Sequence, residues 1–395
     1  MLRNKELLAI ASQYPTPFYL YDGNSIEKQY QLLQNAFKNT SNFQVNYAVK
    51  ALSTIRIIQF VKKLGAKIDT VSINEVKLAL QAGYLPQEIS FTPNGVPFEE
   101  IEEAMALKVH ITLDNYEQIK RIAQKKESYP IGLRINPKVK DGGNKKIKVA
   151  GKNSKFGLPL EHLPKIHQLV DNYQLKVIGL HIHVGSDVSN ITSYLASAQV
   201  LFDTAKTFKQ LQFINFGGGF KVKYKEDDTF IDIHIFGDQI TSLFNAFNKT
   251  YPSDLKLIIE PGKFLVSKAG YFLTKVSVIK KKNVFVNSGF NHFIRPMYYN
   301  AYHNVRNISS DSPAKKNYHI VGYVCEQDNF AKNRKINKPH IGDILCFDNA
   351  GAYSFTMASN YNSRLRPMEL FVYNDTIQII REKETFNDLL NHQVY

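Results

Sequence analysis

The chain of 395 residues has no tryptophan, only two cysteines and no long run of apolar residues. A helix needs about 20 consecutive apolar residues to span a bilayer, so we expect no membrane partner. Cys325 and Cys346 are too few for a disulfide framework or a zinc ribbon, although one functional thiol stays open. The opening segment MLRNKELLAIASQYPTP lacks the apolar core and cleavage site of a signal peptide. We therefore expect a cytoplasmic protein.

Acidic residues are also scarce, with 35 Asp and Glu against 50 Lys and Arg, which leaves a net charge of +15. The basic residues do not form a strip interleaved with aromatic side chains, so we expect no nucleic-acid partner. Residues 137–156 hold seven lysines and one aspartate. This lysine-rich segment has two interpretations that stay open, a lid that attracts an anionic substrate or a solvated loop of biased composition.

Eight short apolar runs rich in β-branched residues occupy the first two thirds of the chain. Helical patterns with capping residues and glycine stops separate most of them, and this alternation is typical of parallel strands joined by helices. Eight such units predict an α/β fold, the (β/α)8 TIM-type barrel, which we place at residues 23–270. The predicted strands are 43–49, 66–71, 88–93, 109–114, 131–137, 176–184, 213–217 and 255–261.

The pattern changes after about residue 270. Strand-like runs such as YFLTKVSVI, DILCFDNAG and MELFVYN follow one another with turn residues and no comparable helix between them. The run PFYLYD near the start is strand-like as well. We therefore predict a second, all-β domain, a C-terminal β-barrel or β-sandwich formed by residues 271–395 together with residues 1–22.

Polar residues follow several predicted barrel strands, at the ends where barrel enzymes carry their chemistry. Lys50 follows the first strand; if desolvated there, its amine has a lowered pKa and can bond covalently to an aldehyde. The alternative is an ordinary lysine on a surface loop. His183 ends the sixth strand and is either functional or a packed barrel-lining histidine. Asp69 ends the second strand, where it either takes part or only caps a helix or orients a neighbour.

Glycines 217–219 follow the seventh predicted strand, where barrels often bind a phosphate through backbone N–H groups. A tight turn is the alternative, and Ser186 could add a hydroxyl to the same phosphate. Glu260 ends the apolar run LIIE, and a buried carboxylate needs a partner such as a protonated ring nitrogen. A reactive lysine, a phosphate cradle and this carboxylate together indicate pyridoxal 5'-phosphate, an electron sink suited to decarboxylation or racemisation.

Longer motifs carry a family resemblance. YAVKA, HIHVGS, GGGF and EPGK lie in the predicted barrel, and NHFIRPMYYNAYH, VCE and DNAGAYSFTMASNYNSRLRP lie in the predicted β domain. With these motifs, nearly the whole chain resembles the alanine-racemase-like barrel decarboxylases that use pyridoxal phosphate, and most of all those acting on meso-2,6-diaminopimelate. The resemblance implies decarboxylation of that amino acid to L-lysine and carbon dioxide, the last step of lysine biosynthesis.

The resemblance also implies roles for individual residues. Lys50 would hold the cofactor covalently, His183 would stack on its ring and Cys325 would supply a proton after carbon dioxide leaves. It further implies a homodimer in which the cysteine segment reaches the partner's active site. Cofactor contacts would be Lys50, Asp69, His183, Ser186, Gly218, Gly219, Glu260, Gly262, Lys263 and Tyr353. Substrate contacts would be Lys263, Arg295, Tyr299, Glu326 and Tyr353.

Two alternatives stay open at this point. A decarboxylase of the same fold could act on carboxynorspermidine or a basic amino acid, but these lack the far carboxylate that Arg295 would bind. Lys263 stands where the family usually has arginine, which keeps this alternative in play. The second alternative is an inactive relative that binds other proteins. Such a protein is expected to have lost Lys50, Cys325 or Glu260, and all three are present.

Overall fold

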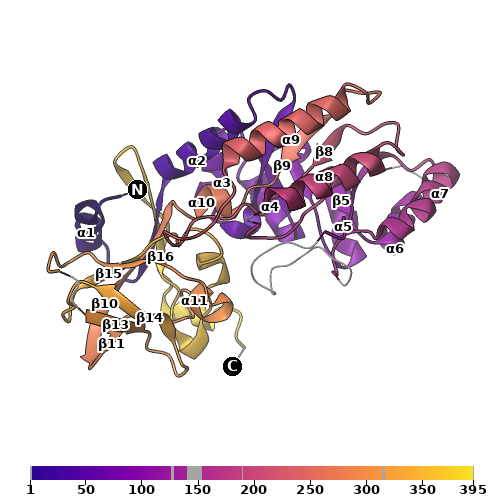
Figure 1. Ribbon diagram of the computed structural model, residues 1–395. Coiled ribbons are helices and arrows are strands. Elements are labelled where there is room, and N and C mark those ends of the chain that lie inside the picture. Colours follow the sequence, from indigo (N-terminus) through magenta and orange to yellow (C-terminus); the bar gives the residue numbers. More distant parts are fainter. Residues whose placement is uncertain (1, 126–128, 140–153, 189, 314–315, 395) are drawn as a thin grey trace. The chain divides into compact units, whose positions relative to one another are not determined.

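The computed structural model divides into two compact units. The barrel unit comprises Gln29–Lys221 and Thr229–Phe264, and the β unit comprises Met1–Lys28, Val222–Asp228 and Leu265–Tyr395. The elements of both units are labelled in Figure 1. The structure describes residues 2–125, 129–139, 154–188, 190–313 and 316–394.

Within the described residues, eight parallel strands close into the predicted barrel. The first strand pairs with the second and also with the last, for example Val45 with Ile259, and this pairing closes the ring. Each strand lies inside one of the eight predicted runs, so the prediction of a TIM-type barrel is confirmed. The strands are β2 (Phe43–Ala48), β3 (Lys67–Thr70), β4 (Ile89–Phe91), β5 (His110–Leu113), β6 (Ile131–Arg134), β7 (Val177–His181), β8 (Phe213–Asn215) and β9 (Lys256–Ile259).

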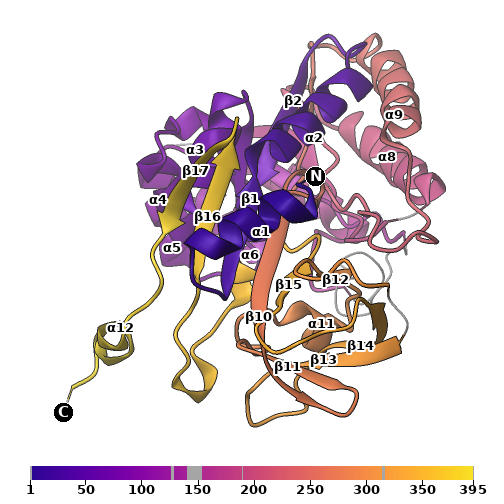
Figure 2. The same ribbon diagram turned by 90° about the vertical axis from the view of Figure 1, so that its left-hand side faces the viewer.

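Helices α3 to α9 connect successive barrel strands, α2 precedes the first strand and α10 follows the last, and local sequence sets the helix ends. Ser72 caps α4 by accepting a hydrogen bond from the N–H of Glu75, and Gly65 ends α3 with a left-handed φ of +99°. Figures 1 and 2 show α8 and α9 lying side by side. The helices are α2 (Gly23–Ala36), α3 (Ile55–Lys63), α4 (Ile73–Gln81), α5 (Phe98–Ala106), α6 (Tyr116–Ala123), α7 (Leu163–Tyr173), α8 (Ile191–Ala205), α9 (Ile233–Asn248) and α10 (Lys263–Val266).

The β unit contains a mixed sheet, which confirms the expected β domain after the barrel. Its main order is β14-β13-β11-β10-β1-β16-β17, with β15 pairing to β10 and β12. Strand β1 pairs antiparallel with β10 and parallel with β16, and Figure 2 shows β16 beside β17. The strands are β1 (Phe18–Asp22), β10 (Gly270–Lys280), β11 (Asn283–Val286), β12 (Val305–Asn307), β13 (Lys316–Val321), β14 (Asn329–Ile336), β15 (Ile344–Phe347), β16 (Met368–Tyr373) and β17 (Thr376–Arg381).

Among the described residues of this unit, three short α-helices accompany the sheet: α1 (Asn4–Gln13), α11 (Arg295–Tyr299) and α12 (Phe386–Leu390). Leu7 and Ile10 of α1 pack in an apolar cluster with Leu20, Tyr271 and Cys346. Burying a leucine or isoleucine side chain contributes about 1.5–3 kcal/mol, so α1 belongs to the core of the unit. Burial also raises the pKa of the Cys346 thiol, which makes it a packing residue and leaves Cys325 as the exposed thiol.

Two sequence predictions stay untested by the fold, the lid formed by the lysine-rich segment and the cytoplasmic location. Residues 140–153 of the lysine-rich segment lie outside the described residues, so the prediction of a lid stays a prediction. Among the described residues, no helix combines the length and apolar character needed to cross a membrane. The expected cytoplasmic location also stays a prediction.

Candidate active site

Lys50 lies directly after β2, on the short 3-10 turn η1 (Val49–Ala51) at the carboxyl end of the barrel. Its Nζ is 3.0 Å from Oδ2 of Asp69, which is buried at the end of β3, while the Lys50 side chain remains 37% exposed. Burial and the nearby Glu260 carboxylate raise the pKa of Asp69, and the Lys50 ammonium opposes that rise. The amine of Lys50 is therefore accessible, while the carboxyl group of Asp69 beside it is buried.

Glu260 follows β9 and is held on both sides. Its Oε2 is 2.9 Å from Nε2 of His181, and the amide of Asn215 donates to Oε1 at 2.6 Å. Burial alone would raise the pKa of Glu260, but the charge and hydrogen bond of His181, helped by Lys50, lower it to about 2. The site thus contains a buried carboxylate that stays ionised, with lone pairs left for a further donor.

His183 lies two residues beyond His181 and contacts the glycine turn. Its Nδ1 accepts a hydrogen bond from the N–H of Gly218 at 3.2 Å, so the proton of the neutral ring is on Nε2. Burial, followed by the charges of Arg134 and Lys50, lowers the pKa of His183 well below its usual value. The ring is therefore neutral near pH 7.

The glycine turn after β8 leaves no room for side chains. A Cβ at Gly218 would lie 2.1 Å from the carbonyl oxygen of Glu260, and one at Gly219 would lie 1.8 Å from that of Gly185. Gly219 also has a φ of +101°, which strongly favours glycine. Ser186 lies in the preceding loop, and among the described residues its hydroxyl has no hydrogen-bond partner. Because the N–H of Gly218 donates to His183, the N–H of Gly219 and the hydroxyl of Ser186 are the donors left where a phosphate was predicted.

Lys263 begins α10 and is buried, and its ammonium forms an ion pair with Asp187. The family resemblance implied that Lys263 contacts both cofactor and substrate, and in the structure its charge is already partly balanced by Asp187. Gly262 packs tightly against the end of β2, because a Cβ there would lie 3.2 Å from that of Ala48. Both residues therefore help to fix the carboxyl end of the barrel.

Some residues of this cluster were missed by the sequence prediction. His181 lies at the end of the sixth predicted strand but was given no role, although the alternation in HIH places it on the same face as His183. Asn215 and Asp187 carry no sequence signal, because only the fold brings them to Glu260 and Lys263. Asn215 positions the Glu260 carboxylate, and Asp187 positions the Lys263 ammonium.

Arg295 is the most unusual predicted substrate residue of the β unit. It begins α11, is only 7% exposed, and donates to Nε2 of His303 at 3.3 Å and to the hydroxyl of Tyr224 at 3.4 Å. Among the described residues it has no carboxylate partner. A buried guanidinium without a carboxylate is costly, so this arrangement favours a site for an anionic ligand.

The other four predicted site residues of the β unit each have different neighbours. The hydroxyl of Tyr299 is 3.9 Å from the sulfur of Met357. Tyr353 has a φ of +54°, a strained conformation for a residue with a side chain. Cys325 is exposed. Glu326 accepts a hydrogen bond from the hydroxyl of Tyr361 at 3.0 Å.

The side chains at the carboxyl end of the barrel have the chemical groups needed to bind pyridoxal phosphate. It offers an accessible amine, a glycine turn in which side chains would collide with backbone oxygens, and a buried anionic carboxylate. Oδ1 of Asp69 and Nδ1 of His181 are buried and lack hydrogen-bond partners among the described residues. Such unsatisfied atoms are expected where a polar ligand is bound. A parallel barrel with this set at its carboxyl end is the architecture of a pyridoxal phosphate enzyme.

Comparison with known protein families also indicates a pyridoxal phosphate enzyme. Residues 23–267 match the pyridoxal binding domain of the pyridoxal-dependent decarboxylases. The chain therefore belongs to the pyridoxal-dependent decarboxylase family, and its cofactor is pyridoxal phosphate.

Relatives resemble the chain along its whole length. The diaminopimelate decarboxylase of Methanothermobacter thermautotrophicus is 34% identical over 100% of this chain and 95% of its own length. The crystal structure of diaminopimelate decarboxylase from Helicobacter pylori complexed with L-lysine has a TM-score of 0.89 and 31% identity, covering 97% of this chain and 98% of that one. The enzyme from M. jannaschii in co-complex with L-lysine has a TM-score of 0.90 and 28% identity, covering 99% and 94%.

Proposed function

We propose that the chain decarboxylates meso-2,6-diaminopimelate to L-lysine and carbon dioxide. Full-length similarity to diaminopimelate decarboxylases supports the reaction. The observation that carries the substrate assignment is Arg295, a buried guanidinium with no carboxylate partner among the described residues. Diaminopimelate has an amino acid group at each end and can supply that carboxylate, whereas lysine and ornithine cannot.

The barrel residues bind and orient the cofactor in this proposal. Pyridoxal phosphate, when bound, supplies an electron sink that stabilises negative charge at the substrate α-carbon. Lys50 holds it covalently, and Asp69 positions the Lys50 amine. Glu260 faces the ring nitrogen as an ionised partner, because its pKa lies near 2. His183 provides a neutral ring for stacking.

The phosphate group is assigned to donors that surround the glycine turn. These donors are the hydroxyl of Ser186 and the backbone N–H groups of Gly219 and Gly218. The N–H of Gly218 would exchange its bond to Nδ1 of His183 for one to the phosphate. Tyr353 is proposed to add its hydroxyl. Gly262 and Lys263 support this end of the barrel, where Asp187 fixes the Lys263 ammonium.

Residues of the β unit are proposed to recognise the substrate. Arg295 and Tyr299 bind the far carboxylate, and Glu326 binds the far ammonium. Cys325 donates the proton that replaces the lost carboxyl group. The thiol is exposed, which is consistent with access to a ligand or a partner chain.

We also propose that the enzyme is a homodimer in which the segment holding Cys325 and Glu326 serves the partner's cofactor. Both residues are exposed in the single chain. Exposed groups with a predicted catalytic role are expected where a second subunit completes the site. The family resemblance points the same way.

Carbon dioxide release from single substrates tests the proposal. Purified holoenzyme is supplied in parallel with meso-diaminopimelate, L-lysine, L-ornithine or carboxynorspermidine. We expect release from meso-diaminopimelate with one L-lysine formed per carbon dioxide, and kcat/KM at least about a hundredfold lower for the others. Preference for another substrate would replace the assignment by the alternative decarboxylase. Release of carbon dioxide from none of the four substrates would instead support the inactive relative.

A further inference from the structure

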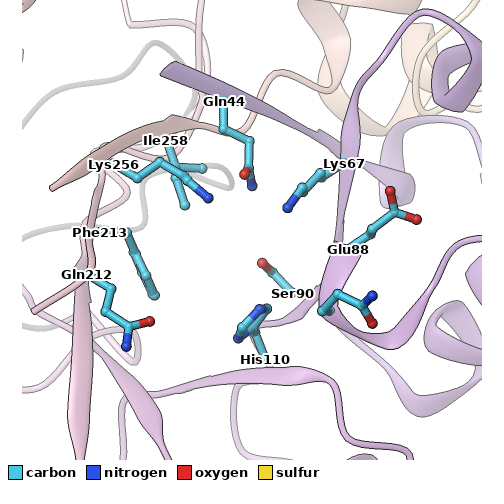
Figure 3. Close-up of a pocket in the computed structure, with 10 residues that line it drawn as sticks. Gln44, Lys67, Glu88, Ser90, His110, Gln212, Phe213, Lys256 and Ile258 are labelled. Carbon is cyan, nitrogen blue, oxygen red and sulfur yellow. The ribbon is translucent and has the colours of Figure 1, made fainter. Parts of the chain in front are cut away.

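A cavity lies at the amino-terminal end of the barrel, opposite the candidate active site. It encloses about 150 Å³, far more than the roughly 10–15 Å³ that one water molecule requires. Figure 3 shows the ammonium ends of Lys67 and Lys256 directed toward its centre, with Gln44 between them and Ser90 opposite. The first residues of β3, β5 and β9 all contribute to its wall.

Strand periodicity separates this cavity from the cofactor site. Successive side chains of a strand alternate between faces, so Lys67 shares a face with Asp69, and Lys256 shares a face with Glu260. At about 3.3 Å per residue, the backbone positions of each pair lie roughly 7 and 13 Å apart along their strands. The same two strands thus carry carboxylates at one end of the barrel and lysines at the other.

The positive charges in the cavity are only partly balanced: the hydrogen bond from Leu85, the ion pair with Lys62 and the charge of Lys67 together lower the pKa of Glu88. Among the described residues, neither Lys67 nor Lys256 forms an ion pair. The acidic wall residue, Glu88, is bound by the ammonium of Lys62 at 3.0 Å and by the N–H of Leu85 at 2.9 Å. Burial and the charge of Lys67 lower the pKa of Lys256. Two like charges therefore face one partly enclosed space, which a bound anion would stabilise.

Neutral donors converge on the same space. The amide of Gln44 donates one hydrogen to Oδ1 of Asn46 at 2.6 Å, and Nδ2 of Asn46 donates to the hydroxyl oxygen of Ser90 at 3.1 Å. An amide nitrogen has two hydrogens, and a hydroxyl that accepts can still donate. Gln44 and Ser90 thus each keep one hydrogen for a ligand, and the buried Asn46 fixes their orientation.

We propose that this cavity binds a small oxyanion, such as inorganic phosphate, through Lys67, Lys256, Gln44 and Ser90. The site is separate from the cofactor and substrate residues, and it does not depend on which amino acid the enzyme decarboxylates. Two ammonium groups supply the charge, and the amide and the hydroxyl supply directed hydrogen bonds. A five-atom tetrahedral ion fits within the volume.

Phosphate titration of the holoenzyme tests the site. Isothermal titration calorimetry at constant ionic strength, balanced with potassium chloride, is expected to show one phosphate per chain and a Tm that rises with phosphate. The visible absorption of the bound cofactor is expected to stay constant, which shows that phosphate does not displace it. Lys67→Gln and Lys256→Gln should each weaken phosphate binding about tenfold or more, because each removes a charged hydrogen bond.

Lys209→Gln is the matched control, since Lys209 is exposed and lies outside the cavity. It should leave the phosphate Kd unchanged. Because each cavity substitution removes a repulsion, the phosphate-free Tm of Lys67→Gln should be no lower than that of wild type. No detectable phosphate binding, or equal weakening in all three variants, would overturn the proposal.

Discussion

At the scale of single residues, the site depends on charges that the fold holds in place. Lys50 remains accessible while Asp69 is buried beside it, and Glu260 stays ionised because His181 and Asn215 bind it. Lys50 and Glu260 were predicted from sequence because they end apolar strands. Asn215 was not predictable, because a polar residue at a strand end has many roles and only its distance to Glu260 reveals this one.

Substitution of Lys50 separates its covalent role from its charge. Lys50→Arg keeps a cation beside Asp69 but removes the amine that bonds to the cofactor, so we expect kcat to fall by at least about a thousandfold. Thermal unfolding should show that the variant is folded, with a Tm near wild type. Lys50→Ala should be equally inactive. Turnover by Lys50→Arg near the wild-type rate would contradict the assigned role.

Asp328 predicts a specific pH dependence of stability. It is buried between Gly289 and Gly322, and its Oδ1 accepts from the N–H of Phe290 at 2.9 Å. Burial raises its pKa from 3.8 to about 7. The folded state therefore holds a proton that the unfolded state releases, and stability should fall as pH rises from about 4 to about 7, by at most about 1.4 kcal/mol per pH unit.

Asp328→Asn should remove this slope, as measured by urea unfolding at several pH values between 4 and 8. Well above pH 7, from about pH 8, the wild-type contribution should be constant, because the carboxyl is then ionised in both states. Asp311→Asn, at an exposed position, is the control and should keep the wild-type profile. Parallel profiles for wild type and Asp328→Asn would show that Asp328 is not the titrating group.

At the scale of elements, the barrel strands were predictable because each is a short β-branched run between turn or capping residues. Two strands of the β unit, β12 and β14, were missed. β12 has only three residues, and β14, with the sequence NFAKNRKI, is charged. β14 lies at the edge of its sheet, where lysine and arginine protect the open side, so its composition resembles a loop.

The glycine turn after β8 is the element whose backbone matters most for the cofactor. Gly219→Ala introduces a Cβ 1.8 Å from the carbonyl oxygen of Gly185, at a φ of +101°. We expect the turn to shift and the affinity for pyridoxal phosphate to fall about tenfold or more, measured by absorbance titration of the apoenzyme. Gly83→Ala is a matched control, because its φ is +94° and no atom lies within 4 Å of the added Cβ.

Gly83→Ala should cost about 1 kcal/mol of stability from backbone strain, without loss of cofactor affinity. A comparable loss of affinity in both variants would mean that strain, and not the packing of the glycine turn, explains the effect.

At the scale of the whole molecule, the proposed homodimer can be tested by mixing inactive variants. Lys50→Ala and Cys325→Ala chains are refolded together in equal amounts and assayed for lysine formation. If each active site takes Lys50 from one chain and Cys325 from the other, half of the dimers are mixed and contain one intact site of two. The mixture should then recover about a quarter of wild-type activity. Recovery of no activity would indicate that one chain supplies both residues.

The substrate assignment depends most directly on Arg295. The decisive measurement is KM for meso-diaminopimelate in wild type and in Arg295→Met, which keeps the apolar stem and removes the guanidinium. Loss of the charged hydrogen bonds should raise KM about tenfold or more, while Tm and cofactor absorption stay close to wild type. An unchanged KM in a folded, cofactor-loaded Arg295→Met variant would contradict the assignment of meso-diaminopimelate as the substrate.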